Sequence, residues 1–211
     1  MTEILDVYDA NRRRIGTADR NVVHTVGLWH KTVHCWIVWN DKILFQRRAR
    51  KLDNNPGKLY TTASGHVSAG EDIATAFRRE VAQEIGLNMD NPKLGEPRLL
   101  YETVWVGDFA KTNGQMFYDR VFANVYFARY DGDLSDFVFS DGEVDSIVAL
   151  DLQEFIAFAQ NPRGTIQALE FDGTEISKIN VQSADFTLVG DESVYAKFGR
   201  IAEQIRLTGW K

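Results

Sequence analysis

Cysteine is nearly absent from this chain, because Cys35 is the only one among 211 residues. A single thiol cannot form an internal disulfide, so the fold must be held together by its core. Cys35 stands in an apolar run, where a small buried side chain is expected.

Long hydrophobic runs are also missing. No stretch approaches the ~20 apolar residues that cross a bilayer, and the N-terminal MTEILDVYDANRRR lacks the apolar core of a signal peptide. We therefore expect a cytoplasmic protein that does not bind membranes.

The chain also lacks an excess of basic residues. Thirty acidic residues stand against 24 basic ones, which gives a net charge of −6 and a pI near 5.3. A protein of this charge does not bind nucleic acid through a broad electrostatic surface. The content of 44% hydrophobic and 26% charged residues is that of a folded globular protein. The net charge therefore argues against nucleic acid as a partner.

The length suits one domain with an appendage. We expect a domain over residues 1–160 that includes an N-terminal hairpin, and an extension over 161–211. The extension is predicted to hold a hairpin, 166–171 with 176–181, and a last helix that Asp191 caps. That helix carries apolar residues at helical spacing, namely Val194, Phe198, Ile201 and Ile205. This face must pack on the same domain or at a subunit interface, so a homodimer is one possible arrangement.

Strand and helix patterns alternate through the rest of the chain and predict an α+β fold. Residues 33–40 are β-branched and aromatic, as in a strand that is covered on both faces. Further strands are expected over 4–8, 15–18, 42–48, 98–106, 116–130 and 144–150, with a helix over 151–160 that begins in a D-x-x-E capping box. Between two of these strands, residues 107–115 are predicted to form a glycine-bearing loop in reach of a substrate.

A helix is also expected over 73–85, directly after a glycine-bearing loop. Ile73, Phe77, Val81 and Ile85 recur every fourth residue, and acidic residues at 71–72 and Gly86 suit its two ends. On another side, Glu80, Gln83 and Glu84 are related by three and four residues, so their head groups converge. Two close carboxylates suit a cation such as Mg²⁺ or Mn²⁺, whereas the alternative is a solvated polar face.

This stretch resembles the Nudix box, G-x5-E-x7-R-E-U-x-E-E-x-G-U, in which U is a bulky aliphatic residue. The matching positions are Gly65, Glu71, Arg79, Glu80, Val81, Glu84, Gly86 and Leu87. The resemblance implies the Nudix fold, a mixed β-sheet between helices, and a metal-dependent pyrophosphohydrolase. It implies that Glu80 and Glu84 bind Mg²⁺, with Mn²⁺ as the alternative ion, and that Arg79 and Glu71 orient them. It also implies catalytic roles for Glu80, Glu84 and Arg79. Gln83 departs from the box, which leaves the number of metal ions and the general base open.

The surrounding sequence is similar to the Nudix branch that contains isopentenyl-diphosphate isomerase and its hydrolase relatives. Ser64 stands where the isomerase carries a catalytic cysteine, and a serine hydroxyl does not easily replace a thiol in carbon chemistry. Arg47 and Lys51 occupy positions that hold the substrate diphosphate in the isomerase; the alternative is that both are solvated. His66 corresponds to a metal ligand of the isomerase, or it hydrogen-bonds the loop.

The expected function is therefore hydrolysis of a diphosphate bond in a nucleoside diphosphate linked to another group, or in a related organic pyrophosphate. An isomerase of isopentenyl diphosphate and a non-catalytic nucleotide-binding module are the alternatives. His30 and His34 are candidate metal ligands, but because no cysteine or carboxylate stands at ligand spacing, capping or partly buried histidines are expected instead. Asp119 is expected to be exposed at a strand end, with a position facing the site as the alternative. Glu143 is a further acidic candidate near the metal.

Overall fold

The computed structural model describes residues 3–209 except 54, 89, 112–113 and 190–191. The helices are α1 (Arg20–Val26), α2 (Ile73–Ile85), α3 (Leu152–Gln160) and α4 (Val194–Leu207), with 3₁₀ turns η1 (Leu134–Asp136) and η2 (Ser183–Asp185). The strands are β1 (Ile4–Tyr8), β2 (Arg14–Asp19), β3 (His30–Trp39), β4 (Lys42–Arg48), β5 (Leu59–Tyr60), β6 (Ala63–His66), β7 (Arg98–Ala110), β8 (Met116–Tyr130), β9 (Val144–Asp151), β10 (Ile166–Phe171), β11 (Ile176–Val181), β12 (Leu188–Val189) and β13 (Glu192–Ser193).

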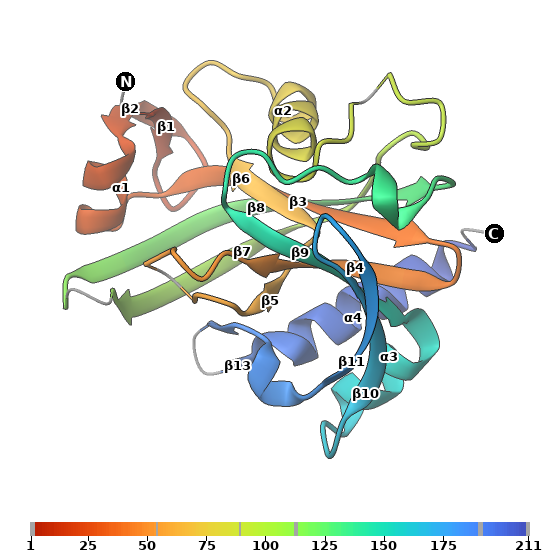
Figure 1. Cartoon of the computed structure of the whole chain (residues 1–211). Helices are drawn as coiled ribbons and strands as arrows, with labels where there is room; N and C mark the ends of the chain where they lie inside the picture. Colours follow the sequence, from red (N-terminus) through yellow and green to blue (C-terminus); the bar gives the residue numbers. More distant parts are fainter. Residues whose placement is uncertain (1–2, 54, 89, 112–113, 190–191, 210–211) are drawn as a thin grey trace.

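One mixed sheet of nine strands forms the centre of the molecule (Figure 1). Its order is β11-β10-β9-β4-β3-β8-β7, and only β3 and β8 pair in parallel. β3 and β4 pair directly at just two positions, Val38 with Ile43 and Trp39 with Lys42. Beyond that point β6 pairs with β3 and β5 pairs with β4. The sheet therefore splits along its middle, and this opening lies beside the candidate site.

Helices cover both faces of this sheet, with α2 on one side and α3 and α4 on the other (Figure 1). Successive side chains of a strand point to opposite faces, so β3 supplies both cores. Trp36 packs with Phe45 and Phe198 on the side of α4. Val33 and Ile37 belong to the second core, which includes the apolar residues of α2. The expected α+β class and the mixed sheet between helices are confirmed.

The observed elements differ from the prediction in three places. β7 continues to Ala110 in register with β8, so the loop predicted over 107–115 is wrong in its first part. α1 was not predicted; Asp19 caps its start, and Gly27, at φ 77°, ends it. The short β5 and β6 were also not predicted, because two to four residues carry too little pattern to be recognised. The predicted cap Asp191 lies outside the described residues.

The described part of residues 161–211 packs on the same sheet. β10 pairs with β9, and α4 packs against α3. The segment before β12 reaches back to the centre, where the Thr187 backbone N–H donates to the Leu59 carbonyl at 3.2 Å. Phe198, Ile201 and Ile205 are buried, as their helical spacing predicts. Among the described helices, none has the length and apolar character needed to cross a membrane.

Candidate active site

Helix α2 presents two carboxylates toward the interior rather than to solvent. The Asp72 side chain caps its start by accepting from the Thr75 backbone N–H, and Gly86, at φ 71°, ends it. Its apolar residues fix the rotation of the helix on the sheet. That rotation leaves Glu80 8% exposed and Glu84 4% exposed. Both glutamates are therefore buried, and the alternative of a solvated polar face is wrong.

Glu84 is held by two neutral donors. Its Oε2 accepts from the Ser64 backbone N–H at 2.9 Å and from the Gln46 side-chain amide at 3.2 Å. Burial, reinforced by repulsion from Glu80, raises the pKa of Glu84 well above its ordinary value. None of the main influences on this pKa comes from a cation. The ionised form of Glu84 therefore needs a positive charge that the described side chains do not supply.

Arg79 joins Glu80 to the loop before the helix. Its guanidinium donates to both oxygens of Glu71, at 3.0 and 2.9 Å, and to Oε1 of Glu80 at 2.6 Å. It also donates to the His66 carbonyl at 2.9 Å and, more weakly, to Oε1 of Gln83 at 3.3 Å. Burial raises the pKa of Glu80, and Arg79 only partly offsets this effect. Arg79 thus bridges Glu71 and the Glu80 carboxylate, an arrangement that suits the orienting role implied by the resemblance.

Gly65 lets the Glu80 carboxylate approach β6. A Cβ built on Gly65 would lie 2.0 Å from both Cδ and Oε1 of Glu80, a distance that real Cβ atoms do not reach. The backbone of Gly65 does not have a positive φ, so this glycine is required by space rather than by conformation. The first glycine of the box therefore makes room for a carboxylate.

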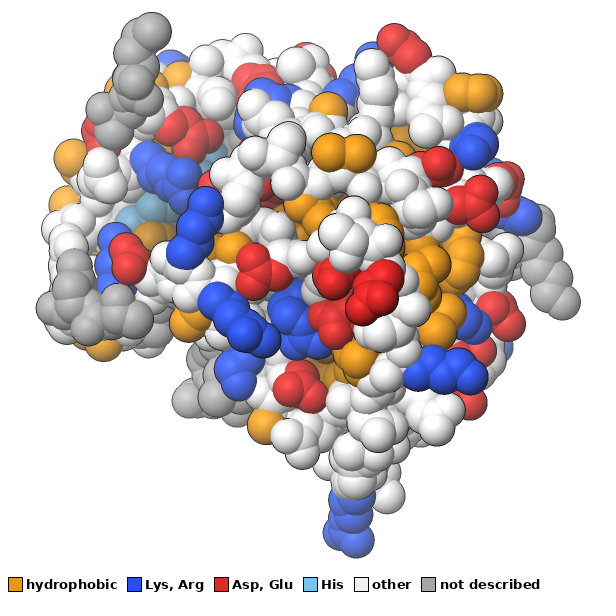
Figure 2. All heavy atoms as spheres, viewed as in Figure 1, with side chains coloured by type: hydrophobic (Ala, Val, Ile, Leu, Met, Phe, Trp, Pro, Cys, Tyr) orange, Lys and Arg blue, Asp and Glu red, His pale blue; other side chains and the backbone are white. Residues whose placement is uncertain are grey.

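These carboxylates line a cleft of about 640 Å³ at the opening of the sheet. Such a volume suits a small-molecule ligand. Arg20, Arg48 and Arg79 contribute positive charge, and Glu143 lies on the wall. The position of Glu143 agrees with its candidacy near a metal. Figure 2 shows histidine surface beside Lys and Arg side chains on the part of the molecule where β1 and β2 lie.

The two residues expected to hold a diphosphate do not line this cleft. Arg47 donates to Oε1 of Glu170 at 2.6 Å and to the Gly57 carbonyl at 3.2 Å. It borders a separate hollow near β10. The pairing of β4 with β9 shifts register between Arg47 and Arg48, and Arg48 faces the cleft instead. The Lys51 ammonium lies against Gly142, in the loop that precedes Glu143.

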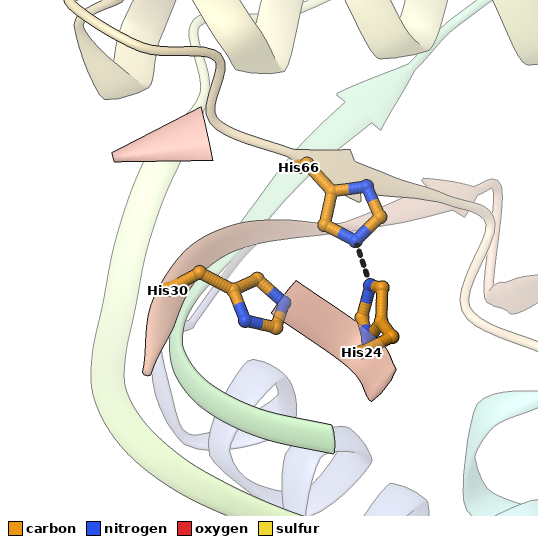
Figure 3. A group of neighbouring side chains, drawn as sticks. All are labelled: His24, His30 and His66. Atoms are coloured by element: carbon orange, nitrogen blue, oxygen red, sulfur yellow. Dashed lines mark hydrogen bonds between the residues drawn. The ribbon is translucent and has the colours of Figure 1, made fainter. Parts of the chain in front are cut away.

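Three histidines that are distant in sequence meet beside the cleft (Figure 3). His24 comes from α1, His30 from β3 and His66 from β6, and one ring nitrogen of each lies within 4.8 Å of the others. Nε2 of His24 and Nε2 of His66 are 3.0 Å apart. Asp119 Oδ1 lies 3.6 Å from Nδ1 of His24 and 3.7 Å from Nε2 of His30. Nitrogen and carboxylate ligands in this number suit a transition metal or zinc.

Burial keeps the imidazoles of His24 and His30 uncharged near neutral pH. It lowers the pKa of His24 to about 2 and that of His30 to about 4, with further lowering from His66. Burial also raises the pKa of Asp119 to about 7. The expectation of an exposed Asp119 is wrong, because only 28% of its side chain is exposed. His30 and His34 are fully rather than partly buried, and sequence spacing gave no sign that the three histidines converge.

Residues 28–169 of the chain match the NUDIX domain. This protein belongs to the Nudix family. The match covers more than half of the chain and includes the box, the split sheet and β9. The predicted fold and the predicted membership of a Nudix hydrolase family are therefore confirmed.

Several relatives of this Nudix protein are hydrolases by name. An uncharacterized Nudix hydrolase of Clostridium acetobutylicum is 28% identical over 163 residues, which cover 75% of each chain. Nudix hydrolase 3 of Arabidopsis thaliana is 26% identical over 74% of this chain, but the match spans only 20% of the plant protein. Isopentenyl-diphosphate Delta-isomerase 1 of Aromatoleum aromaticum is 26% identical over 63% of this chain and 70% of the isomerase. A crystal structure from Deinococcus radiodurans, with 19% identity and a TM-score of 0.61, covers 95% of this chain and 99% of its own and supports the fold.

Proposed function

We propose that this protein hydrolyses a diphosphate bond in a nucleoside diphosphate linked to another group, or in a related organic pyrophosphate. We further propose that Glu80 and Glu84 bind a divalent cation, Mg²⁺ or Mn²⁺, during this reaction. The observation that supports this proposal best is the pair of buried carboxylates with raised pKa values in the cleft. A cation between them would offset the repulsion that burial makes severe.

The donor set fits such an ion. Carboxylate oxygens are the ligands that hard divalent cations prefer, and Arg79 leaves Oε2 of Glu80 without a salt bridge among the described residues. When bound, the cation would neutralise phosphate charge and make a water molecule easier to deprotonate. Arg79 and Glu71 hold Glu80 in place, and a carboxylate of the cleft accepts the proton of the attacking water. Arg48 is our candidate for holding the phosphate that does not leave.

The histidine cluster offers a second position for a metal. Nε2 of His30 is buried and has no hydrogen-bond partner among the described residues. It lies on the side of the ring that faces Asp119. An unpaired nitrogen in an uncharged imidazole fits a metal ligand. Binding of Mn²⁺ or Zn²⁺, measured by titration calorimetry, should lose one site in a His30→Asn variant. The same variant should keep the site at Glu80 and Glu84.

Activity of a Glu84→Gln variant tests the hydrolase proposal. The substitution keeps the size of the side chain and its two hydrogen bonds but removes the charge. Metal-dependent phosphate release should fall at least 100-fold across ADP-ribose, dinucleotides, nucleotide sugars, coenzyme A and nucleoside triphosphates. Glu154→Gln, on the exposed surface of α3, is the matched control and should keep full activity. Full activity in Glu84→Gln would refute the assignment.

Two alternative functions have separate tests. An isomerase is disfavoured because Ser64 has no thiol, and conversion of isopentenyl diphosphate by the unaltered protein would reverse that ranking. A binding module is the other alternative. A ligand from the same panel that raises the melting temperature of the protein without being consumed, in the presence of Mg²⁺, would favour binding over turnover.

A further inference from the structure

The wall of the cleft includes three buried polar atoms that the hydrolytic site does not use. They are Oγ1 of Thr32, Nδ1 of His34 and Oγ1 of Thr187, and none has a hydrogen-bond partner among the described residues. An unpaired buried polar atom costs about 1–3 kcal/mol of stability. Three of the five such atoms among the described residues belong to side chains that line this one cleft, which indicates that a ligand supplies the missing partners.

These atoms belong to one region next to the metal-binding carboxylates. Thr32 and His34 are two residues apart on β3, so their side chains lie on the same face of the sheet. His34 is directly opposite Ser64 in the pairing of β3 with β6. The Ser64 backbone N–H donates to Glu84. His34 and Glu84 line the same cleft, so a single ligand can contact both.

Aromatic rings form the rest of this region, and the C-terminal part of the chain completes it. The His34 ring lies 4.8 Å from that of Trp105 and 5.9 Å from that of Tyr60, measured between centroids. Nζ of Lys197, on α4, lies 5.1 Å from the centre of the Trp105 ring. Thr187 is placed beside Tyr60 by its backbone hydrogen bond to Leu59. The region is thus both apolar and able to form hydrogen bonds.

We propose that Thr32, His34 and Thr187 bind the uncharged, hydroxyl-bearing half of the substrate, a nucleoside or a sugar. This proposal rests on the proposed function, because it assigns the other end of the same cleft. Hydroxyl groups and an uncharged imidazole can each donate or accept, which suits ring hydroxyls and base edges rather than a second charged group. A prenyl chain would leave all three atoms unpaired, so this cleft selects against an isoprenoid diphosphate.

Equilibrium binding without metal tests this inference separately from hydrolysis. Dissociation constants are measured by titration calorimetry in EDTA for ADP, glucose 1-phosphate, inorganic pyrophosphate and isopentenyl diphosphate. ADP or glucose 1-phosphate should bind at least tenfold more tightly than inorganic pyrophosphate and isopentenyl diphosphate. The difference in affinity between ADP and glucose 1-phosphate shows whether the subsite prefers a nucleoside or a sugar. Tighter binding of pyrophosphate or isopentenyl diphosphate, or no binding of any probe, would overturn the proposal.

Thr→Val substitutions then locate the contacts. Thr187→Val and Thr32→Val keep shape and remove one hydroxyl, so each should weaken the preferred probe about tenfold and leave pyrophosphate unchanged. Both variants should melt at the same or a higher temperature, because they remove an unpaired buried hydroxyl. Thr165→Val, on an exposed loop, is the control. Unchanged affinity in both cleft variants would refute this subsite even if Glu84→Gln abolishes hydrolysis.

Discussion

Gly65 lies beneath the Glu80 carboxylate, and a methyl group there would occupy the space that this carboxylate fills. The Cβ of an alanine would stand 2.0 Å from Cδ of Glu80. Carbon atoms in contact prefer about 3.5–4.0 Å, so the two groups must separate by about 1.5 Å. Glu80 cannot swing away freely, because Arg79 holds it at 2.6 Å and only 11% of its side chain is exposed.

A displacement of about 1 Å in a catalytic group can lower a rate about 100-fold. We therefore expect Gly65→Ala to lower kcat for Mg²⁺-dependent hydrolysis about 100-fold and to weaken metal binding. Overpacking of this kind should also lower the free energy of unfolding by about 1–3 kcal/mol. Steady-state kinetics at saturating substrate, a metal titration and a thermal melt measure the three effects.

Two further variants separate this steric effect from a general effect of alanine. Gly16→Ala lies on β2, where the nearest atom to a Cβ is 3.9 Å away, and it should leave kcat and stability nearly unchanged. In a Glu80→Ala background the space above Gly65 is free, so Gly65→Ala should no longer destabilise the protein. A Gly65→Ala enzyme with kcat within twofold of the unaltered enzyme would refute the reasoning. Equal destabilisation in both backgrounds would refute it as well.

Three other predictions concern charge in and around the cleft. Because the pKa of Glu84 is raised, the folded protein loses stability when this carboxyl group ionises as pH rises. Glu84→Gln carries no ionisable group there, so without metal at pH 8 it should melt at a higher temperature than the unaltered protein. Arg48→Gln should raise KM about tenfold, because Arg48 lines the cleft. Arg47→Gln should leave KM unchanged and lower the free energy of unfolding by about 1–3 kcal/mol, because it removes the ion pair with Glu170. If steady-state kinetics and denaturant melts gave the reverse pattern, Arg47 rather than Arg48 would be the substrate-binding residue. Because the pKa of His30 is lowered, the free energy of unfolding should fall as pH falls from 6.5 toward 4, by at most about 1.4 kcal/mol per pH unit. In metal-free melts, the stability of His30→Asn should therefore depend less steeply on pH over this range.

The local features of the site could be predicted because each depends on residues close in sequence. The period of four from Ile73 to Ile85 places α2 on the sheet, and the same period brings Glu80 and Glu84 together. Glu71 lies just before α2, and Arg79 lies eight residues later within the helix, so their pairing also follows from the spacing of the box. The long strands β3 and β8 are recognisable in the sequence because they are long and rich in apolar and aromatic residues.

Other features depend on contacts that no short pattern records. Arg47 and Arg48 are adjacent, and a register shift in the pairing with β9 accompanies the exchange of their roles. The resemblance to the isomerase implies that Arg47 holds the diphosphate, but it is Arg48 that faces the cleft. Lys51 similarly depends on the position of the loop around Gly142, which comes from the other half of the chain.

Sequence alone indicated the family, the helix over 73–85 and the convergence of Glu80 and Glu84, because these depend on spacing within 23 residues. The contact that requires a glycine at position 65 is visible only in the folded structure. Only the tertiary structure decided what surrounds that helix. The parallel pairing of β3 with β8 and the insertion of β6 bring His24, His30, His66 and Asp119 to one point. The return of the C-terminal segment to Leu59 adds Thr187 to the cleft. The box thus specifies the pair of carboxylates in the cleft, and long-range packing builds the walls around them.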